Sequence, residues 1–173
     1  MWEKPADFSP IRRQLSEYLK QSLGKKTREW AYQGVPPKAF VEPIITDWDG
    51  NIPVDYKFHT FGGTVFAIQA DVDRFKGHKR SFYTPEWTEM PFHITYEAAP
   101  PVPAPANLSE MLSIASTIGK QFSYARVDLY DTGSQPFFGE VTFYPDAGNV
   151  HFDPPAWDGI FGSQWLMPAA SPA

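Results

Sequence analysis

Two strand-like segments on either side of Gly62-Gly63 constrain the fold more than any other part of the sequence. Residues 54–61 and 64–71 are both rich in β-branched and aromatic side chains, the composition that favours strands. A pair of glycines adopts the positive φ angles of a two-residue hairpin loop without strain. The sequence therefore predicts an antiparallel β-hairpin over residues 54–71.

Two further segments have the apolar spacing of amphipathic helices. Residues 9–24 begin with Ser-Pro, a favourable helix start, and end at a glycine. Residues 108–121 follow Asn107, and Glu110 stands three residues after that asparagine. This spacing predicts a capping box at the start of the second helix.

More strands are expected on both sides of the second helix. Residues 124–131 and 136–144 alternate in polarity around a short turn, which predicts a second hairpin. Residues 39–46 read as a buried strand that Pro43 interrupts. Together the segments predict an α+β fold, in which an antiparallel sheet carries the helices on one face and leaves the opposite face to a ligand.

Composition excludes several classes of protein. The 173 residues contain no cysteine, so disulfides and thiolate metal sites are excluded. A net charge of −5 argues against a nucleic-acid partner, since phosphate backbones attract basic surfaces. No apolar run is long enough to cross a bilayer, and the first residues do not resemble a signal peptide. We expect a cytoplasmic protein without a membrane partner.

The second hairpin contains the strongest candidate site. Arg126 and Asp128 share one face of the first strand, and Glu140 and Thr142 share a face of the second. The turn between the strands predicts that Asp128 lies opposite Glu140 and that Arg126 lies opposite Thr142. Two facing carboxylates suit Mg²⁺. An exposed strand face with solvated charges explains the same spacing, so spacing alone leaves both interpretations open.

A second pair of charges lies on the strand before Gly62. Asp55 and Lys57 share one face of this strand. The lysine suits a phosphate group and the aspartate suits ribose hydroxyls. A simple pair of surface charges fits the same spacing.

Basic residues gather after the first hairpin, at Arg74, His78, Lys79 and Arg80. Such a cluster can hold an anionic substrate or a transferring phosphoryl group. A solvated loop is the alternative interpretation.

Seven short runs occur in an order that resembles the TupA-like ATP-grasp family, which is named for teichuronopeptide synthesis. They lie within about residues 25–160 and are 28–32, 41–45, 55–58, 71–75, 78–83, 126–130 and 139–143.

The resemblance implies a nucleotide site in the first half of the matching region. The segment from Glu42 to Ile45, including Ile44, would meet adenine chiefly through backbone groups. Asp55 would accept from the ribose, and Lys57 would approach the nucleotide phosphates.

The same resemblance implies roles for the second hairpin. Asp128 and Glu140 would bind Mg²⁺, and Thr142 stands where many ATP-grasp enzymes have an asparagine ligand. Arg126 would stabilise an acyl-phosphate and the intermediate that follows it. Arg80 would also be catalytic, through contact with the substrate or the γ-phosphate.

The remaining implied contacts are to substrate. Arg74 and Lys79 would contact the substrate or the γ-phosphate. The implied activity is an ATP- and Mg²⁺-dependent carboxylate–amine ligase in bacterial cell-surface polymer biosynthesis, with a small carboxylate and a small amine as substrates.

The sequence also departs from the family pattern, because no glycine-rich phosphate loop precedes Val41. We therefore expect residues 25–162 to be the C-terminal part of an ATP-grasp domain, with 1–24 as a lead-in and 163–173 as a loose tail. A separate N-terminal half or an oligomer partner would complete it.

Two alternatives remain open at this point. The chain could be a truncated, non-catalytic ATP-grasp remnant that binds nucleotide without turnover. It could also be a carbohydrate-binding β-sandwich that uses its tryptophans, an alternative that the high aromatic content supports. Trp48, Trp87, Trp157 and Trp165 are otherwise expected to be packing residues.

Overall fold

A computed structural model describes residues 7–21, 29, 32–74 and 76–166. The chain forms two compact units, Met1–Pro43 and Ile44–Ala173, which are described separately. Within the described residues, no helix is both long and apolar enough to span a bilayer.

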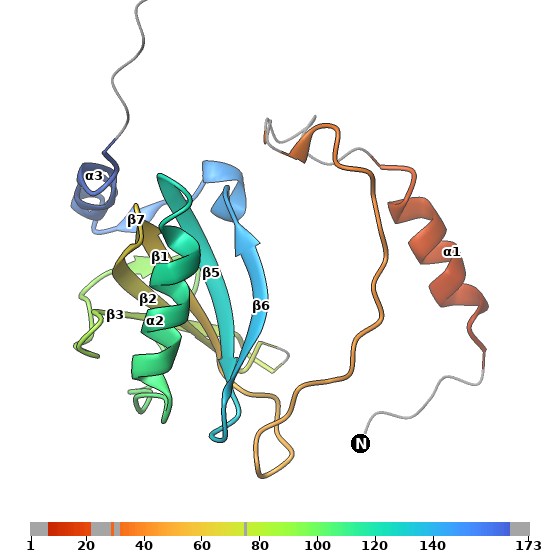
Figure 1. Cartoon of the computed structure of the whole chain (residues 1–173), viewed down its shortest axis with the longest axis horizontal. Helices are drawn as coiled ribbons and strands as arrows, with labels where there is room; N and C mark the ends of the chain where they lie inside the picture. Colours follow the sequence, from red (N-terminus) through yellow and green to blue (C-terminus); the bar gives the residue numbers. More distant parts are fainter. Residues whose placement is uncertain (1–6, 22–28, 30–31, 75, 167–173) are drawn as a thin grey trace, which may run out of the picture. The chain divides into compact units, whose positions relative to one another are not determined.

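The first unit contains helix α1 (Ser9–Tyr18), as the sequence predicts (Figure 1). Pro10 lies in its first turn, where a missing N–H group breaks no helical hydrogen bond. The helix ends at Tyr18 rather than at Gly24, and residues 22–28 lie outside the described part of the chain. None of its residues is buried, so no packing supports a longer helix.

The second unit is built on an antiparallel sheet of five strands in the order β3-β2-β1-β5-β6. The predicted hairpin is β1 and β2, and Gly62 and Gly63 turn it with φ angles of 56° and 88°. The strands are β1 (Asp55–Phe61), β2 (Thr64–Val72), β3 (Lys79–Tyr83), β5 (Tyr124–Asp131) and β6 (Pro136–Thr142).

Helix α2 (Leu108–Gly119) covers one face of this sheet and contacts β1, β2 and β5 (Figure 1). Met111 and Ala115 of the helix are fully buried against Phe58, Ile68 and Val127 of the strands. This packing confirms the predicted α+β fold. A helix rather than a second sheet closes this core, so the fold does not match the β-sandwich alternative.

The predicted capping box at α2 is wrong. Asn107 precedes the helix, but its side chain makes no capping hydrogen bond. It donates instead to Asp131 Oδ1 over 2.8 Å, and its backbone N–H donates to Asp131 Oδ2 over 3.1 Å. Asp131 at the end of β5 therefore binds the Asn107 side chain in place of the helix backbone, and this contact fixes the start of α2 to the sheet.

A second apolar cluster lies across part of the opposite face. Ala67 and Phe82 alternate with residues that pack on α2, so they point the other way. They meet Phe92 and Phe161 in this cluster, and Trp157 stacks on Phe92 with ring centroids 4.6 Å apart. The elements around the cluster are β4 (His93–Ile94), the 3-10 helix η2 (Pro145–Gly148), β7 (Phe152–Asp153) and α3 (Ala156–Ser163).

The predicted strand at residues 39–46 is also wrong. The segment is irregular and exposed, and the side chain of Val41 is 97% exposed. Pro43 lacks the N–H group that a strand needs for pairing, and Pro36 and Pro37 precede the segment. The fifth strand of the sheet is instead β3, which lies in a stretch that the sequence suggested was a polar loop.

A substitution at Gly119, at the end of α2, tests the packing of α2 on the sheet. A Cβ atom there would lie 2.7 Å from Thr60 Cβ, and the Thr60 hydroxyl is held by a 2.8 Å hydrogen bond to the Ala125 carbonyl. We expect Gly119→Ala to lower the free energy of unfolding by about 1–3 kcal/mol, because the helix must move away from the sheet. Urea unfolding followed by circular dichroism measures the change.

Gly159→Ala in α3 is the matched control. No atom lies within 4 Å of a Cβ built at Gly159, so we expect no loss and a gain of up to about 1 kcal/mol from helix propensity. Equal stabilities of the two variants would contradict the packing of α2 described above.

Candidate functional site

The face opposite α2 carries a row of buried charges. Alternation in β1 places Asp55, Lys57 and His59 on this face. Lys57 pairs in register with Asp128 of β5. Its ammonium lies 2.6 Å from Asp55 Oδ2 and 2.6 Å from Asp128 Oδ2. The lysine that the sequence assigned to phosphate therefore bridges two aspartates from neighbouring strands.

Arg126 is the other partner of Asp128. Its Nε donates to Asp128 Oδ1 and its Nη2 to Asp128 Oδ2, each over 2.8 Å. The same Nη2 donates to Thr142 Oγ1 over 3.0 Å and lies 3.6 Å from Glu140 Oε1. The three predicted metal ligands thus converge on one guanidinium. Burial acts to lower the pKa of Arg126, but Asp128 outweighs it and the pKa is raised.

The register between β5 and β6 confirms one predicted pair and corrects the other. Arg126 lies opposite Thr142, but the register shifts between Val127 and Leu129. Asp128 and Glu140 therefore do not form a simple facing pair, because the irregularity lies between them. The Glu140 side chain is 67% exposed, whereas Asp128 is buried.

Gly139 accommodates this irregularity. A Cβ atom at position 139 would lie 3.1 Å from the Asp128 carbonyl oxygen and 3.1 Å from the Tyr130 ring. The backbone of β6 comes this close to β5 because glycine has no side chain. The sequence pattern could not reveal the shift, since both strands keep their alternation on each side of it.

The donor set fits Mg²⁺. Carboxylate oxygens from Asp128 and Glu140 and the hydroxyl of Thr142 are the ligand types that this ion takes, and it retains sites for water or phosphate. In this structure the Arg126 guanidinium provides the positive charge at the same point. Among the described residues no group of three or more His, Asp or Glu side chains could hold a metal, so a site here depends on additional oxygen ligands.

A second group of buried polar residues lies on β2 and β3. Arg80 Nε donates to Asp71 Oδ1 over 2.7 Å, and Gln69 Nε2 donates to Asp71 Oδ2 over 2.9 Å. His78 Nε2 lies 3.2 Å from Asp71 Oδ1. Burial acts to raise the pKa of Asp71, but the Arg80 hydrogen bond and charge outweigh it and lower the pKa. Arg80 is therefore a buried strand residue and not part of a solvated loop.

The other predicted substrate contacts lie apart from each other. Arg74 forms an ion pair with Asp55, whose pKa burial raises. Lys79 Nζ lies 3.9 Å from Glu97 Oε2, and strand alternation points Lys79 away from Arg80. The basic cluster of the sequence is thus divided among three carboxylates. The roles of Arg74 and Lys79 at the substrate stay predictions.

The predicted adenine segment precedes β1. Glu42 and Ile44 are exposed and Ile45 is half-buried, without regular secondary structure. Their contact with adenine stays a prediction.

His59 lies buried opposite Arg126 in register. Its Nδ1 lies 3.0 Å from the Tyr124 hydroxyl, and its Nε2 lies 3.4 Å from Gln69 Oε1. Sequence analysis overlooked Gln69, Asp71 and Tyr124 as site residues. The alternation of the first hairpin, which places Gln69 beside Lys57 in register, is the signal that could have found Gln69 and Asp71.

The geometry agrees with the comparison to known families. The family described as TupA-like ATPgrasp matches residues 3–166 of the chain. The chain belongs to the TupA-like ATP-grasp family. Neither a curated protein nor a solved structure gives a match. ATP-grasp proteins generally use ATP and Mg²⁺, which agrees with the oxygen ligands gathered around Arg126.

The pKa of His59 provides a test of this buried network. Burial, aided by the Arg126 charge, lowers the pKa of His59 to about 3, whereas an unfolded histidine titrates near 6.5. Between these values the unfolded chain binds the proton and the folded chain does not. We expect the free energy of unfolding to fall with decreasing pH across this window, by up to about 1.4 kcal/mol per pH unit from this group.

Urea unfolding at a series of pH values measures the slope. His59→Asn should reduce the slope of the free energy of unfolding against pH between pH 6 and 4. His93→Asn, which changes an exposed histidine on β4, should leave this slope unchanged. An unchanged slope in the His59 variant would show that His59 titrates normally in the folded state.

Proposed function

We propose that this chain is an ATP-grasp carboxylate–amine ligase that acts in bacterial cell-surface polymer biosynthesis in the cytoplasm. A carboxylate oxygen of one substrate attacks the γ-phosphorus of ATP, and ADP leaves. The amine nitrogen of the second substrate then attacks the acyl carbon, phosphate leaves with the electrons of the carbon–oxygen bond, and the nitrogen releases a proton.

The observation that carries this proposal is the convergence of three oxygen ligands on Arg126. Asp128 and Thr142 accept hydrogen bonds from its Nη2, and Glu140 lies 3.6 Å from the same atom. Reactions at phosphoryl and acyl centres need positive charge where negative charge develops. The site has a buried cation and a set of hard oxygen ligands at the same place, on the face of the sheet that α2 leaves open.

Different residues of the site would contact the metal and the substrate. Asp128, Glu140 and Thr142 would hold Mg²⁺, which supplies neutralising charge to the phosphates when bound. Arg126 would stabilise the acyl-phosphate, because its Nη2 lies within 3.6 Å of an oxygen atom of each of these ligands. Lys57 keeps Asp128 neutralised and oriented through its 2.6 Å ion pair.

The remaining roles follow the family resemblance. Asp55 would accept from the ribose, and the Glu42, Ile44 and Ile45 segment would meet adenine. The structure shows Asp55 Oδ1 buried without a hydrogen bond among the described residues, which leaves one acceptor for a ligand.

The substrate-facing cations complete the proposal. Arg80, fixed by Asp71, and Arg74 would contact the substrate or the γ-phosphate, whereas the role of Lys79, which points away from Arg80, stays a prediction. Arg74 is close to the nucleotide side of the site, since it forms an ion pair with Asp55.

Glu140 gives the clearest test of Mg-ATP binding. We expect millimolar Mg-ATP to raise the melting temperature of the chain and the Glu140→Gln variant to lose most of that rise. Glu140 is exposed, so the substitution removes one ligand charge without disturbing the core. Differential scanning fluorimetry with Mg-ATP, and with ATP plus EDTA, measures the effect.

Glu86→Gln is the matched control, because Glu86 is an exposed glutamate in the turn after β3. It should keep the full rise in melting temperature. The absence of any rise in the unsubstituted chain would contradict Mg-ATP binding by this site.

Trapping with hydroxylamine tests the chemistry without knowledge of the amine. Hydroxylamine attacks an acyl-phosphate and forms a hydroxamate, so incubation with Mg-ATP and a panel of carboxylic acids reveals the activated acid. Arg126→Lys should lower hydroxamate formation by roughly 10²–10³-fold, since a lysine cannot keep both contacts to Asp128. Its Mg-ATP melting shift should remain.

A second candidate function is nucleotide binding without turnover. In this structure the Arg126 guanidinium contacts all three predicted metal ligands, which favours it. This candidate predicts a Mg-ATP melting shift together with no hydroxamate from any acid in the panel. Hydroxamate formation above the level of the Arg126→Lys variant excludes it.

A further inference from the structure

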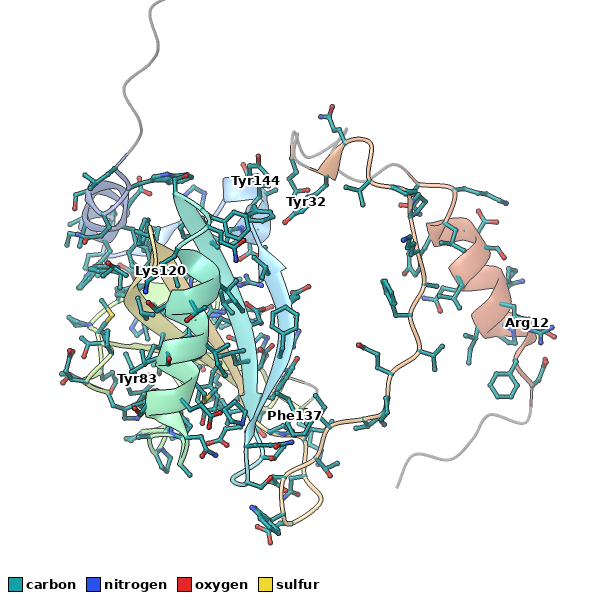
Figure 2. The ribbon with its side chains drawn as sticks, viewed as in Figure 1. Arg12, Tyr32, Tyr83, Lys120, Phe137 and Tyr144 are labelled. Carbon is teal, nitrogen blue, oxygen red and sulfur yellow. The ribbon has the colours of Figure 1, made fainter. Side chains whose placement is uncertain are left out.

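A pocket of about 270 Å³ lies beside the candidate site on the same face of the sheet. Its floor includes His59, Gln69 and Tyr124, and His59 is the register partner of Arg126. Tyr124 precedes Arg126 by two residues on the same face of β5, a distance of about 7 Å along the strand. Tyr144 marks this end of β6 in Figure 2, opposite the end at Phe137. A ligand here lies next to the reacting centre.

The walls of the pocket are aromatic. Phe61 and Phe161 lie with ring centroids 6.5 Å apart, and Phe152 lies 5.1 Å from Phe161. Trp165 lies 5.3 Å from Tyr124 across the floor. Faces and edges of this kind suit an apolar or aromatic ligand body of about one ring, given the volume of the pocket.

The charges around the pocket favour a cation. Asp146 and Asp158 contribute two exposed carboxylates to its lining. Arg80 is the one cation among the described residues that line the pocket, and Asp71 already neutralises it through two hydrogen bonds. A nucleotide or a second carboxylate would be repelled here, whereas an ammonium ion is attracted by the carboxylates and by the aromatic faces.

The hydrogen bonds of the floor have a fixed direction. The Asp71 carboxylate only accepts, so the Gln69 amide turns its NH₂ toward Asp71 and its oxygen toward His59. His59 therefore carries its proton on Nε2 and accepts at Nδ1 from the Tyr124 hydroxyl. The phenol oxygen of Tyr124 is left as an acceptor, which suits a ligand that donates N–H.

We propose that this pocket binds the amine substrate as an organic ammonium ion with an apolar or aromatic body, which releases one proton to water before its nitrogen attacks the acyl carbon. The role as a substrate rests on the proposed ligase function, but binding to the pocket does not require ATP. Carboxylates at the rim and the Tyr124 oxygen at the floor hold the nitrogen, and the aromatic walls hold the body. The carboxylate substrate and ATP occupy the Arg126 side.

A pair of probes of equal shape and opposite charge tests the proposal. Isothermal titration calorimetry of the full chain, without nucleotide, compares 2-phenylethylammonium with 3-phenylpropionate. We expect the ammonium ion to bind and the carboxylate to bind at least tenfold more weakly. Raising the salt concentration should weaken the ammonium complex, since exposed charges are screened.

The double variant Asp146→Asn/Asp158→Asn removes the carboxylates of the rim. Both are exposed, so the fold is retained, and we expect ammonium binding to weaken roughly threefold to tenfold. The double variant Asp49→Asn/Glu86→Gln changes the net charge by the same amount at exposed residues outside the pocket and should bind as the unsubstituted chain does.

Each result decides for or against the pocket. Absence of ammonium binding, tighter binding of the carboxylate, or equal losses in both double variants would overturn the proposal. Ammonium binding with no Mg-ATP melting shift would keep the pocket and reject the ligase function. A Mg-ATP shift without ammonium binding would keep the nucleotide site and reject the pocket.

Discussion

The buried ammonium of Lys57 is the contact on which the rest of the polar face depends. It lies 2.6 Å from carboxylates on β1 and β5, and neither Asp55 nor Asp128 could remain charged and buried without a cation. Arg74 and Arg126 extend the pairing at each end. The result is a line of alternating charges across the sheet, in which every member holds its neighbour at a fixed distance.

This line also explains how one sheet would serve the two proposed kinds of ligand. At Arg126 the charges and oxygen ligands suit the proposed anionic nucleotide and metal. Directly opposite Arg126, on β1, His59 stays neutral because burial lowers its pKa to about 3, and the surroundings become aromatic. Along this face of the sheet the side chains change from charged to neutral. This change separates the two environments.

The alternation of side chains along the strands made much of this polar face predictable from the sequence. It placed Asp55 with Lys57 and Arg126 with Asp128, and the glycine pair located the central hairpin. Register irregularities were not predictable, since the shift beside Asp128 leaves no mark in a polarity pattern. Strand propensity gave a wrong prediction at residues 39–46, where apolar residues are present but proline prevents strand pairing. It also missed β3, in which Arg80 is buried because Asp71 neutralises it.

Because β6 lies at the edge of the sheet, the two sides of the site differ in how easily their backbone moves. Asp128 belongs to β5, which is hydrogen-bonded on both sides, whereas Glu140 and Thr142 belong to a strand paired on one side. Edge strands open at lower free energy than central ones. In the proposed metal site, the Glu140 side of the oxygen ligand set would therefore adjust to an entering ion while the Asp128 side stays fixed, and amide exchange along β6 would report on whether the site is filled.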